Sequence, residues 1–353
     1  MKLVMLEDIK IGMVLAEPVL GEFDLLYAHA DDEITDQMLE GLVRLDIPYV
    51  FVRDYSLNDA DIEQENKVNE EFIQAVENYE EVLGVMNSVF DDFHFLDKKV
   101  IENIQKPMDD LIQAVSSNTS MLLKLKRLFL KDAYSLTHSV HVCLLSAMIA
   151  RWNGFRPADI HKIALAGLFH DLGKSRIPDE ILNKPGRLND SELSVMKRHS
   201  ELGYEIAKNH DIFPQDILRG IIEHHERMDG TGYPQGLRKE QIHPFAQIIA
   251  IADVYDAMTT QRSYKNSESP FVAVEIIKDL SYKQHLHTGL VNRFLKNIYR
   301  LYLGAEVILT NGQSGEIVYI NKFSPERPLI RIGDDFLDLY TTPDVDIQQF
   351  KVS

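Results

Sequence analysis

The chain has 353 residues, 45% of them hydrophobic and 26% charged, which is an ordinary globular balance with room for two or three domains. Its net charge of −18 argues against a nucleic acid polymer or an anionic membrane as a partner, because both require a basic surface. The single cysteine, Cys143, excludes a disulfide framework and is expected to pack among apolar neighbours. The first residues mix charges into their apolar stretch, and no run of about 18 apolar residues occurs, so we expect a cytoplasmic protein without membrane insertion.

Residues 1–57 combine strand-like and helix-like patterns. Residues 13–19 and 49–53 alternate apolar and polar side chains, whereas residues 34–45 have helical spacing. We therefore predict a small α/β domain over 1–57. It either binds a ligand or acts only as a scaffold or dimer contact.

Residues 58–115 form a predicted linker of one or more helices. Acidic residues outnumber basic ones from about 60 to 100, and one long amphipathic helix is predicted there. The apolar stripe that supports it consists of Phe72, Val76, Tyr79, Leu83, Met86 and Phe90. This stripe packs either on the rest of the chain or on a second copy, which leaves a homodimer as one alternative.

Residues 116–303 are predicted to form an all-helical domain, and residues 304–353 a short β-structure. Helical periodicity covers 122–151, 158–172, 190–210, 214–226, 246–260, 271–280 and 290–302. Strand-like segments follow at 305–310, 315–321, 329–332 and 336–340, the first two joined across Asn311 and Gly312. The predicted fold class is mainly α, with the small α/β domain before and the β-structure after the helical domain.

Residues 224–234 read HHERMDGTGYP, which is hard to explain as ordinary core or loop. Adjacent side chains point in different directions on a regular element. His224 and His225 can therefore face one cavity only at a helix end, or if the site holds more than one metal. Other metal-binding side chains occur in or beside apolar helical runs, and the complete set is His138, His170, Asp171, His199, His224, His225 and Asp253.

These seven nitrogen and oxygen ligands are too many for one zinc ion and suit two metals, because mixed histidine and carboxylate sets suit iron, manganese or hydrated divalent ions. Two ions that share a carboxylate and a hydroxide are the usual apparatus for hydrolysis of a phosphate ester. Asp171 is the best candidate for the shared carboxylate. An anionic substrate also needs local positive charge, and the nearby cations in sequence are Lys174, Lys184, Arg187, Arg262 and Lys265.

The ordered series of His138, His170-Asp171, His199 with Gly203, His224-His225, Gly232-Tyr233-Pro234 and Asp253 resembles the HD-GYP family of bacterial phosphodiesterases, within the HD phosphohydrolase superfamily. The resemblance covers about residues 125–300. It implies an all-helical catalytic domain that hydrolyses cyclic di-GMP to pGpG or GMP with iron or manganese. Residues 1–57 are similar to a domain that often precedes the catalytic domain in this family.

The resemblance also assigns individual roles. His138 aligns with the family ligand, and His141 is expected to be a surface histidine or an indirect support for the ligands. Tyr134 stands where some members carry a glutamate for a third metal, which favours two ions here. The loop residues expected to order the site around the ligands are Glu226, Asp229, Gly230, Gly232 and Pro234.

Substrate contacts are expected from several side chains. Lys174 matches the family's HDxGK pattern, which implies a contact with phosphate or with charge in the transition state. Tyr233 either touches the substrate or is a buried structural tyrosine. The remaining expected contacts are Lys184 and Arg187 at the entrance, and Asp256, Arg262 and Lys265 in the segment that grips phosphate and guanine in the family.

Two alternatives stay open. The chain could be a receptor that binds cyclic di-GMP but turns it over negligibly, although the usual sign, loss of a ligand or of the GYP residues, is absent from the sequence. It could also keep the chemistry but act on a mixed cyclic dinucleotide or another nucleotide phosphoester, because ligand spacing does not select a base.

Overall fold

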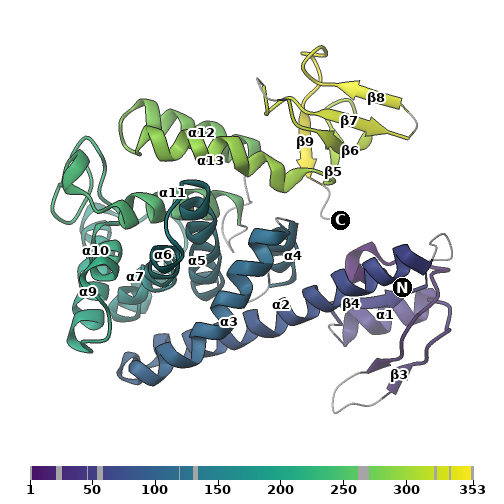
Figure 1. Cartoon of the computed structure of the whole chain (residues 1–353), viewed down its shortest axis with the longest axis horizontal. Helices are drawn as coiled ribbons and strands as arrows, with labels where there is room; N and C mark the ends of the chain where they lie inside the picture. Colours follow the sequence, from purple (N-terminus) through teal and green to yellow (C-terminus); the bar gives the residue numbers. More distant parts are fainter. Residues whose placement is uncertain are drawn as a thin grey trace. The chain divides into compact units, whose positions relative to one another are not determined.

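The computed structural model describes residues 2–20, 26–45, 47–53, 59–118, 120–129, 134–260, 270–321, 324–333 and 335–350 (Figure 1). The chain divides into two compact units, and the boundary between them falls after Val76. It is mainly α, with small sheets near both ends, as predicted. The predicted domain limits at residues 57, 115 and 303 stay predictions. No helix in the described ranges is long and apolar enough to cross a membrane.

The first unit contains two antiparallel strand pairs and one short helix. Thr35 caps the helix, because its hydroxyl accepts from the amide of Met38 at 3.2 Å. Residues 13–19 are strand-like only in part, since Val14 and Leu15 make isolated bridges. The elements are β1 Lys2–Met5 paired with β4 Tyr49–Val52, β2 Val19–Leu20 paired with β3 Leu26–Ala28, and α1 Asp36–Arg44.

The long helix α2, Asp59–Asp91, ends earlier than predicted. The side chain of Asp92 accepts from the amide of His94 and starts the short helix η3, Phe93–Phe95. Asp97 then caps α3, Lys98–Ser117, by accepting from the amide of Val100. Two short acidic side chains therefore interrupt the predicted helix near residue 100, because each binds an amide that would otherwise lack a partner.

The helical region that follows surrounds a buried centre made by α5, α6 and α11 (Figure 1). The predicted helices over 122–151 and 190–210 are each two helices in the structure. The elements are α4 Ser120–Leu128, α5 Tyr134–Trp152, α6 Pro157–Phe169, η4 Leu172–Arg176, α7 Asp179–Leu182, α8 Asp190–Lys197, α9 His199–Asn209, α10 Gln215–Glu223, η5 Lys239–Gln241, α11 Pro244–Thr259, α12 Pro270–Tyr282, α13 Thr288–Ile298 and η6 Tyr299–Tyr302.

A five-stranded antiparallel sheet in the order β8-β7-β6-β5-β9 follows the helices (Figure 1). Four of its strands match the predicted segments, and β9 was not predicted. The ring of Phe350 in β9 packs 5.4 Å from that of Phe271 and 5.1 Å from that of Tyr302, so the sheet is joined to the helices by aromatic contacts. The strands are β5 Glu306–Leu309, β6 Ser314–Tyr319, β7 Leu329–Ile332, β8 Asp335–Asp338 and β9 Ile347–Phe350.

Candidate metal centre

The seven expected ligands come from five places in the helical region and meet in one buried site. His138 lies within α5 and Asp253 within α11, whereas His170 and Asp171 directly follow α6. His199 begins α9, and the pair His224-His225 directly follows α10. Five of these side chains belong to residues that are at most 2% exposed, namely His138, His170, Asp171, His199 and His224.

Helix ends explain how three of the histidine rings are oriented. The Nδ1 atom of His170 donates to the carbonyl of Gly167 at 2.7 Å, and that of His224 donates to Ile221 at 2.6 Å. His199 makes the equivalent bond to Met196 at 2.8 Å. Each acceptor lies in the last turn of the preceding helix, where carbonyls lack an intrahelical partner. Since the proton sits on Nδ1, the lone pair of each ring is on Nε2 and points into the site.

The ring of His138 is also oriented by a hydrogen bond from Nδ1, but the acceptor is a carboxylate instead of a backbone carbonyl. Its Nδ1 atom donates to Oδ2 of Asp256 at 2.7 Å, and its Nε2 atom lies 3.2 Å from Oδ1 of Asp253. Burial alone would lower the pKa of His138, but Asp253 and Asp256 raise it to about 9. Without a cation beside Nε2, this ring is therefore driven to carry a second proton.

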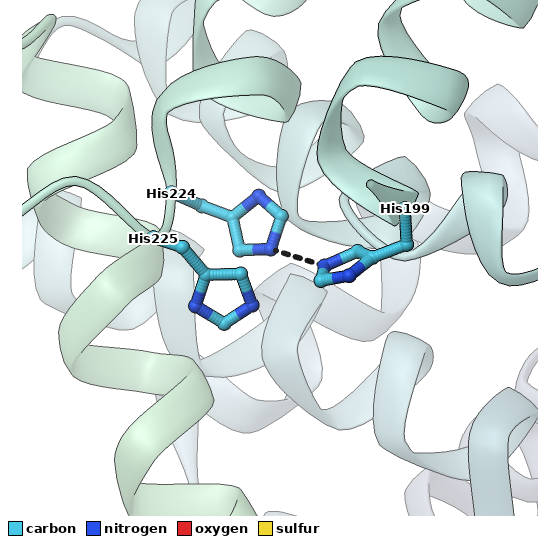
Figure 2. Close-up of side chains that lie close together, drawn as sticks. All are labelled: His199, His224 and His225. Carbon is cyan, nitrogen blue, oxygen red and sulfur yellow. Dashed lines mark hydrogen bonds between the residues drawn. The ribbon is translucent and has the colours of Figure 1, made fainter. Parts of the chain in front are cut away.

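Six of the seven expected ligands form two groups, and the carboxylate of Asp171 reaches both. One group is His138, His170 and Asp171, the other is His199, His224 and His225, and in each the ligand atoms lie within 4.8 Å of one another. The rings of the second group face one space (Figure 2). Oδ2 of Asp171 lies 3.3 Å from Nε2 of His170, and Oδ1 lies 3.5 Å from Nε2 of His199, so this carboxylate reaches both groups.

The donor set fits divalent cations. Nε2 of His199 lies 3.3 Å from Nε2 of His224, although both rings use their Nδ1 proton for a backbone carbonyl. Two lone pairs therefore face each other unless a proton or a cation lies between them. Nε2 of His170 is buried without a hydrogen-bond partner among the described residues. Burial lowers the pKa of His225 to about 3, only partly offset by Asp253, which keeps the ring neutral and able to bind a metal.

Two glycines bring the elements of the site together. A Cβ atom on Gly173 would lie 1.9 Å from the carbonyl oxygen of His199 and 2.4 Å from the amide of Gly203. The backbone of η4 therefore touches the start of α9, and this contact places Asp171 next to His199. Gly203 packs on Gly173 in turn, since a Cβ atom on Gly203 would lie 3.1 Å from the amide nitrogen of Gly173.

The loop after α10 is ordered by Glu226. Its carboxylate accepts from the amides of Gln235 at 2.7 Å and Leu237 at 2.9 Å. Gly232 packs against the backbone of this loop, since a Cβ atom there would lie 2.5 Å from the carbonyl oxygen of His225. The ring of Tyr233 stacks on that of His225, with centroids 4.7 Å apart. The loop therefore holds a half-buried aromatic ring against an expected ligand, His225.

The other expected loop residues have local roles. The carboxylate of Asp229 accepts from the amide and the hydroxyl of Thr231, at 3.0 and 2.7 Å. Gly230 has a φ of 82°, a conformation that side-chain-bearing residues rarely adopt. The peptide bond between Tyr233 and Pro234 is cis.

The predicted cations differ in how they relate to the site. The ammonium of Lys174 lies 2.5 Å from Oδ2 of Asp171 and is partly exposed. That of Lys184 binds both oxygens of Glu192, at 2.7 and 2.6 Å, and Arg187 is exposed. Arg262 and Lys265 lie outside the described residues.

One expectation needs correction, and one pair of alternatives is decided. Asp256 is not placed to touch a substrate, because it is fully buried behind His138 and its carboxylate binds that ring and the ammonium of Lys126, at 2.7 and 2.5 Å. Of the two alternatives for His141, the structure favours the indirect support over the surface histidine, because the residue is 1% exposed and its Nε2 atom lies 3.0 Å from the hydroxyl of Tyr79. It belongs to the support of the ligands.

Lys126 was missed in the sequence. Its position in the sequence indicates burial, because it lies four residues after Leu122 and next to Leu125, on the stripe of α4 that becomes buried. A lysine on such a stripe indicates a buried anionic partner, and Asp256 is that partner.

Comparisons with known proteins agree with this architecture. The family model described as HD domain matches residues 111–287, half of the chain, and the chain therefore belongs to the HD domain family. It is 35% identical over 226 residues to a cyclic di-GMP phosphodiesterase of Pseudomonas aeruginosa, a match that covers 64% of this chain and 54% of the relative. It is 40% identical over 141 residues to a 3'3'-cGAMP-specific phosphodiesterase of Vibrio cholerae, covering 39% of this chain and 32% of the relative.

A solved structure supports the fold. The HDG"Y"P protein from Bdellovibrio bacteriovorus superposes with a TM-score of 0.54 at 17% identity, covering 84% of this chain and 99% of that one. The chain spans about half the length, or less, of the curated relatives that it matches.

We predict that Gly173→Ala separates the two ligand groups. The added methyl group would meet backbone atoms of His199 and Gly203, which cannot move without shifting α9. We expect a loss of about 1–3 kcal/mol in the free energy of unfolding, measured by denaturant titration, together with weaker metal binding.

Gly84→Ala is the matched control. Gly84 lies in α2 with no atom within 4 Å of an added Cβ, so the substitution should be neutral or stabilise the helix by up to about 1 kcal/mol. Equal stability and metal content in the two variants would contradict the proposed contact.

Proposed function

We propose that this chain is a metal-dependent phosphodiesterase that hydrolyses cyclic di-GMP to pGpG or GMP. The observation that carries the proposal is the pair of ligand groups joined by Asp171, with the ammonium of Lys174 2.5 Å from that carboxylate. A buried site of this composition suits phosphate ester chemistry more than a structural metal, because structural zinc sites use four ligands and commonly cysteine. The match to relatives named for this activity supports the same conclusion.

The proposed metals are two divalent ions, iron or manganese, held by His138, His170, Asp171, His199, His224, His225 and Asp253. Two such ions would acidify a shared water and neutralise negative charge on the phosphoryl oxygens. The protein residues fix where this happens. The Nδ1 bonds of His170, His199 and His224 to backbone carbonyls lock their rings, so the ligand atoms need little reorganisation when an ion enters.

Lys174 has two tasks in this proposal. Burial would raise the pKa of Asp171, but His170 and Lys174 hold it well below the usual value, so the group is a carboxylate. The ammonium of Lys174 is also partly exposed, so its remaining N–H groups can donate to a phosphate oxygen at the edge of the site. In this proposal it stabilises the negative charge that a phosphoryl group gains during attack.

The surface around the centre supplies the proposed substrate contacts. Tyr233 offers an aromatic ring whose position is fixed by stacking on His225, and a nucleobase can stack on or border such a ring. Lys184, Arg187, Arg262 and Lys265 are proposed to bind phosphate or base. Among the described cations of this set, Arg187 is the more available, since the ammonium of Lys184 is engaged by Glu192.

Hydrolysis of 3'3'-cGAMP is the second candidate. It rests on the similarity to a Vibrio cholerae phosphodiesterase named as specific for that dinucleotide. The metal centre serves both substrates equally, because the phosphodiester groups are alike and only the bases differ. Negligible turnover by a receptor is disfavoured, since the structure brings every expected ligand together in one site.

The first test is a comparison of substrates with the full chain purified without oxygen. Metal content is counted by elemental analysis, and cyclic di-GMP and 3'3'-cGAMP are supplied separately while products are followed by chromatography. We expect two metals per chain and accumulation of pGpG or GMP from cyclic di-GMP. Tight binding of cyclic di-GMP without product, after loading with iron and manganese, would refute the enzyme and leave the receptor.

We predict that Asp171→Asn lowers kcat by about 10²-fold or more while the fold is kept. Asparagine has almost the same shape but lacks the negative charge that two cations share. The loss is measured by product formation at saturating substrate, with the thermal midpoint as a check on folding. His210→Ala, at a histidine that follows α9 outside the ligand set, is the control and should keep full turnover. Full activity of Asp171→Asn would remove the basis for the site.

We predict that Lys174→Ala separates binding of metal from turnover. The variant should keep both metals, because Lys174 is not a ligand, and should lose about 10²-fold in kcat/KM through the lost phosphate contact. Lys283→Ala, which removes an exposed lysine paired with Asp279 on the surface, is the control and should match the wild type. Unchanged kinetics of Lys174→Ala would show that its ammonium serves only Asp171.

A further inference from the structure

A buried chain of polar contacts links α2 to the proposed metal ligand His138. Oδ2 of Asp256 accepts from Nδ1 of His138 at 2.7 Å, as described above. Oδ1 of the same carboxylate accepts from the ammonium of Lys126 at 2.5 Å and from the hydroxyl of Thr260 at 3.0 Å. Asp256 is thus held on both oxygens, which fixes the direction from which it orients the His138 ring.

His141 extends this chain toward α2. Its Nδ1 atom lies 3.2 Å from Oδ1 of Asp256, although the two are not aligned as a hydrogen bond. Because this nitrogen faces an anion, the proton of the neutral ring belongs on Nδ1 and the lone pair on Nε2. The hydroxyl of Tyr79, 3.0 Å from Nε2, therefore donates to His141.

Tyr79 is firmly held in place. Its side chain is fully buried, and its ring stacks on Phe129 at 4.2 Å with an angle of 13° between the planes. The short helix η3, which follows α2, makes a separate contact. The guanidinium of Arg176 in η4 lies 4.5 Å from the centre of the ring of Phe93 in η3. The segment from α2 to η3 therefore contacts both the support of His138 and the short helix that follows Asp171.

We propose that Tyr79 is a positioning residue for the metal centre, acting through His141 and Asp256 on the ring of His138. This inference rests on the metal centre proposed above and adds to it a role for α2, which lies outside the ligand-bearing helices. Since α2 continues across the boundary between the two compact units, three residues before Tyr79, a change in α2 has a defined path to one ligand.

The test is Tyr79→Phe in the full chain, with Mn²⁺ affinity and stoichiometry measured by titration calorimetry. Loss of the hydroxyl leaves Nε2 of His141 without its donor and frees the ring to turn. We expect two ions to bind still, one of them roughly 3- to 10-fold more weakly. This is less than the roughly 10- to 100-fold loss typical when a direct partner of a ligand is removed, as in Asp256→Asn.

A double-mutant cycle shows whether Tyr79 acts through Asp256. In the Asp256→Asn background, Tyr79→Phe should change Mn²⁺ affinity by less than about twofold, because the path to His138 is already broken. Equal, additive losses in the two backgrounds would overturn the proposed path.

Tyr302→Phe is the matched control, since it removes another buried tyrosine hydroxyl, one that bonds to Tyr255. It should lower the thermal midpoint about as much as Tyr79→Phe does and leave Mn²⁺ binding unchanged. Wild-type Mn²⁺ affinity in Tyr79→Phe would overturn this inference alone. Absence of Mn²⁺ binding by the wild type would overturn both this inference and the proposed enzyme.

Discussion

The convergence of histidine lone pairs in a buried space is the constraint on which the site depends. Nε2 of His199 and His224 face each other at 3.3 Å, and Nε2 of His170 is buried with no hydrogen-bond partner among the described residues. Each buried polar atom without a hydrogen-bond partner costs about 1–3 kcal/mol of folding free energy. A group that binds several of these nitrogens at once therefore stabilises the fold. Divalent cations do so better than protons, because one ion accepts several lone pairs at once.

The helix ends supply what makes this convergence possible. A histidine placed just after a helix can donate Nδ1–H to a carbonyl of the last turn, and His170 and His224 both do so. The same bond fixes the tautomer and the direction of the ring. The short distance between Gly173 and the start of α9 then brings two such ends together, so a backbone contact sets the separation of the ligand groups.

The sequence predicted which residues gather in the site better than it predicted the residues behind them. Each expected ligand motif is local and lies in or beside an apolar run, as in the segment that ends at Asp171, so the local pattern together with the family resemblance revealed it. The pairing of His138 with Asp256 joins positions 118 residues apart, and no local pattern reports such a contact. Asp256 was therefore assigned to the substrate. The strand β9 was missed for a related reason, because its residues IQQF show no clear alternation and pair with β5 through the tertiary fold.

The strength of the contact between Tyr79 and His141 limits what α2 can do to the centre. A net hydrogen bond contributes about 0.5–1.5 kcal/mol, which corresponds to a change of roughly two- to twelvefold in an equilibrium constant. Such a contact could adjust how tightly one ion would be held, but it could not switch a site with seven proposed ligands between full and empty. Any signal that reaches His138 by this path would therefore change activity only by degrees. A complete switch would need α2 to displace Asp256 itself, whose two oxygens are held by His138, Lys126 and Thr260.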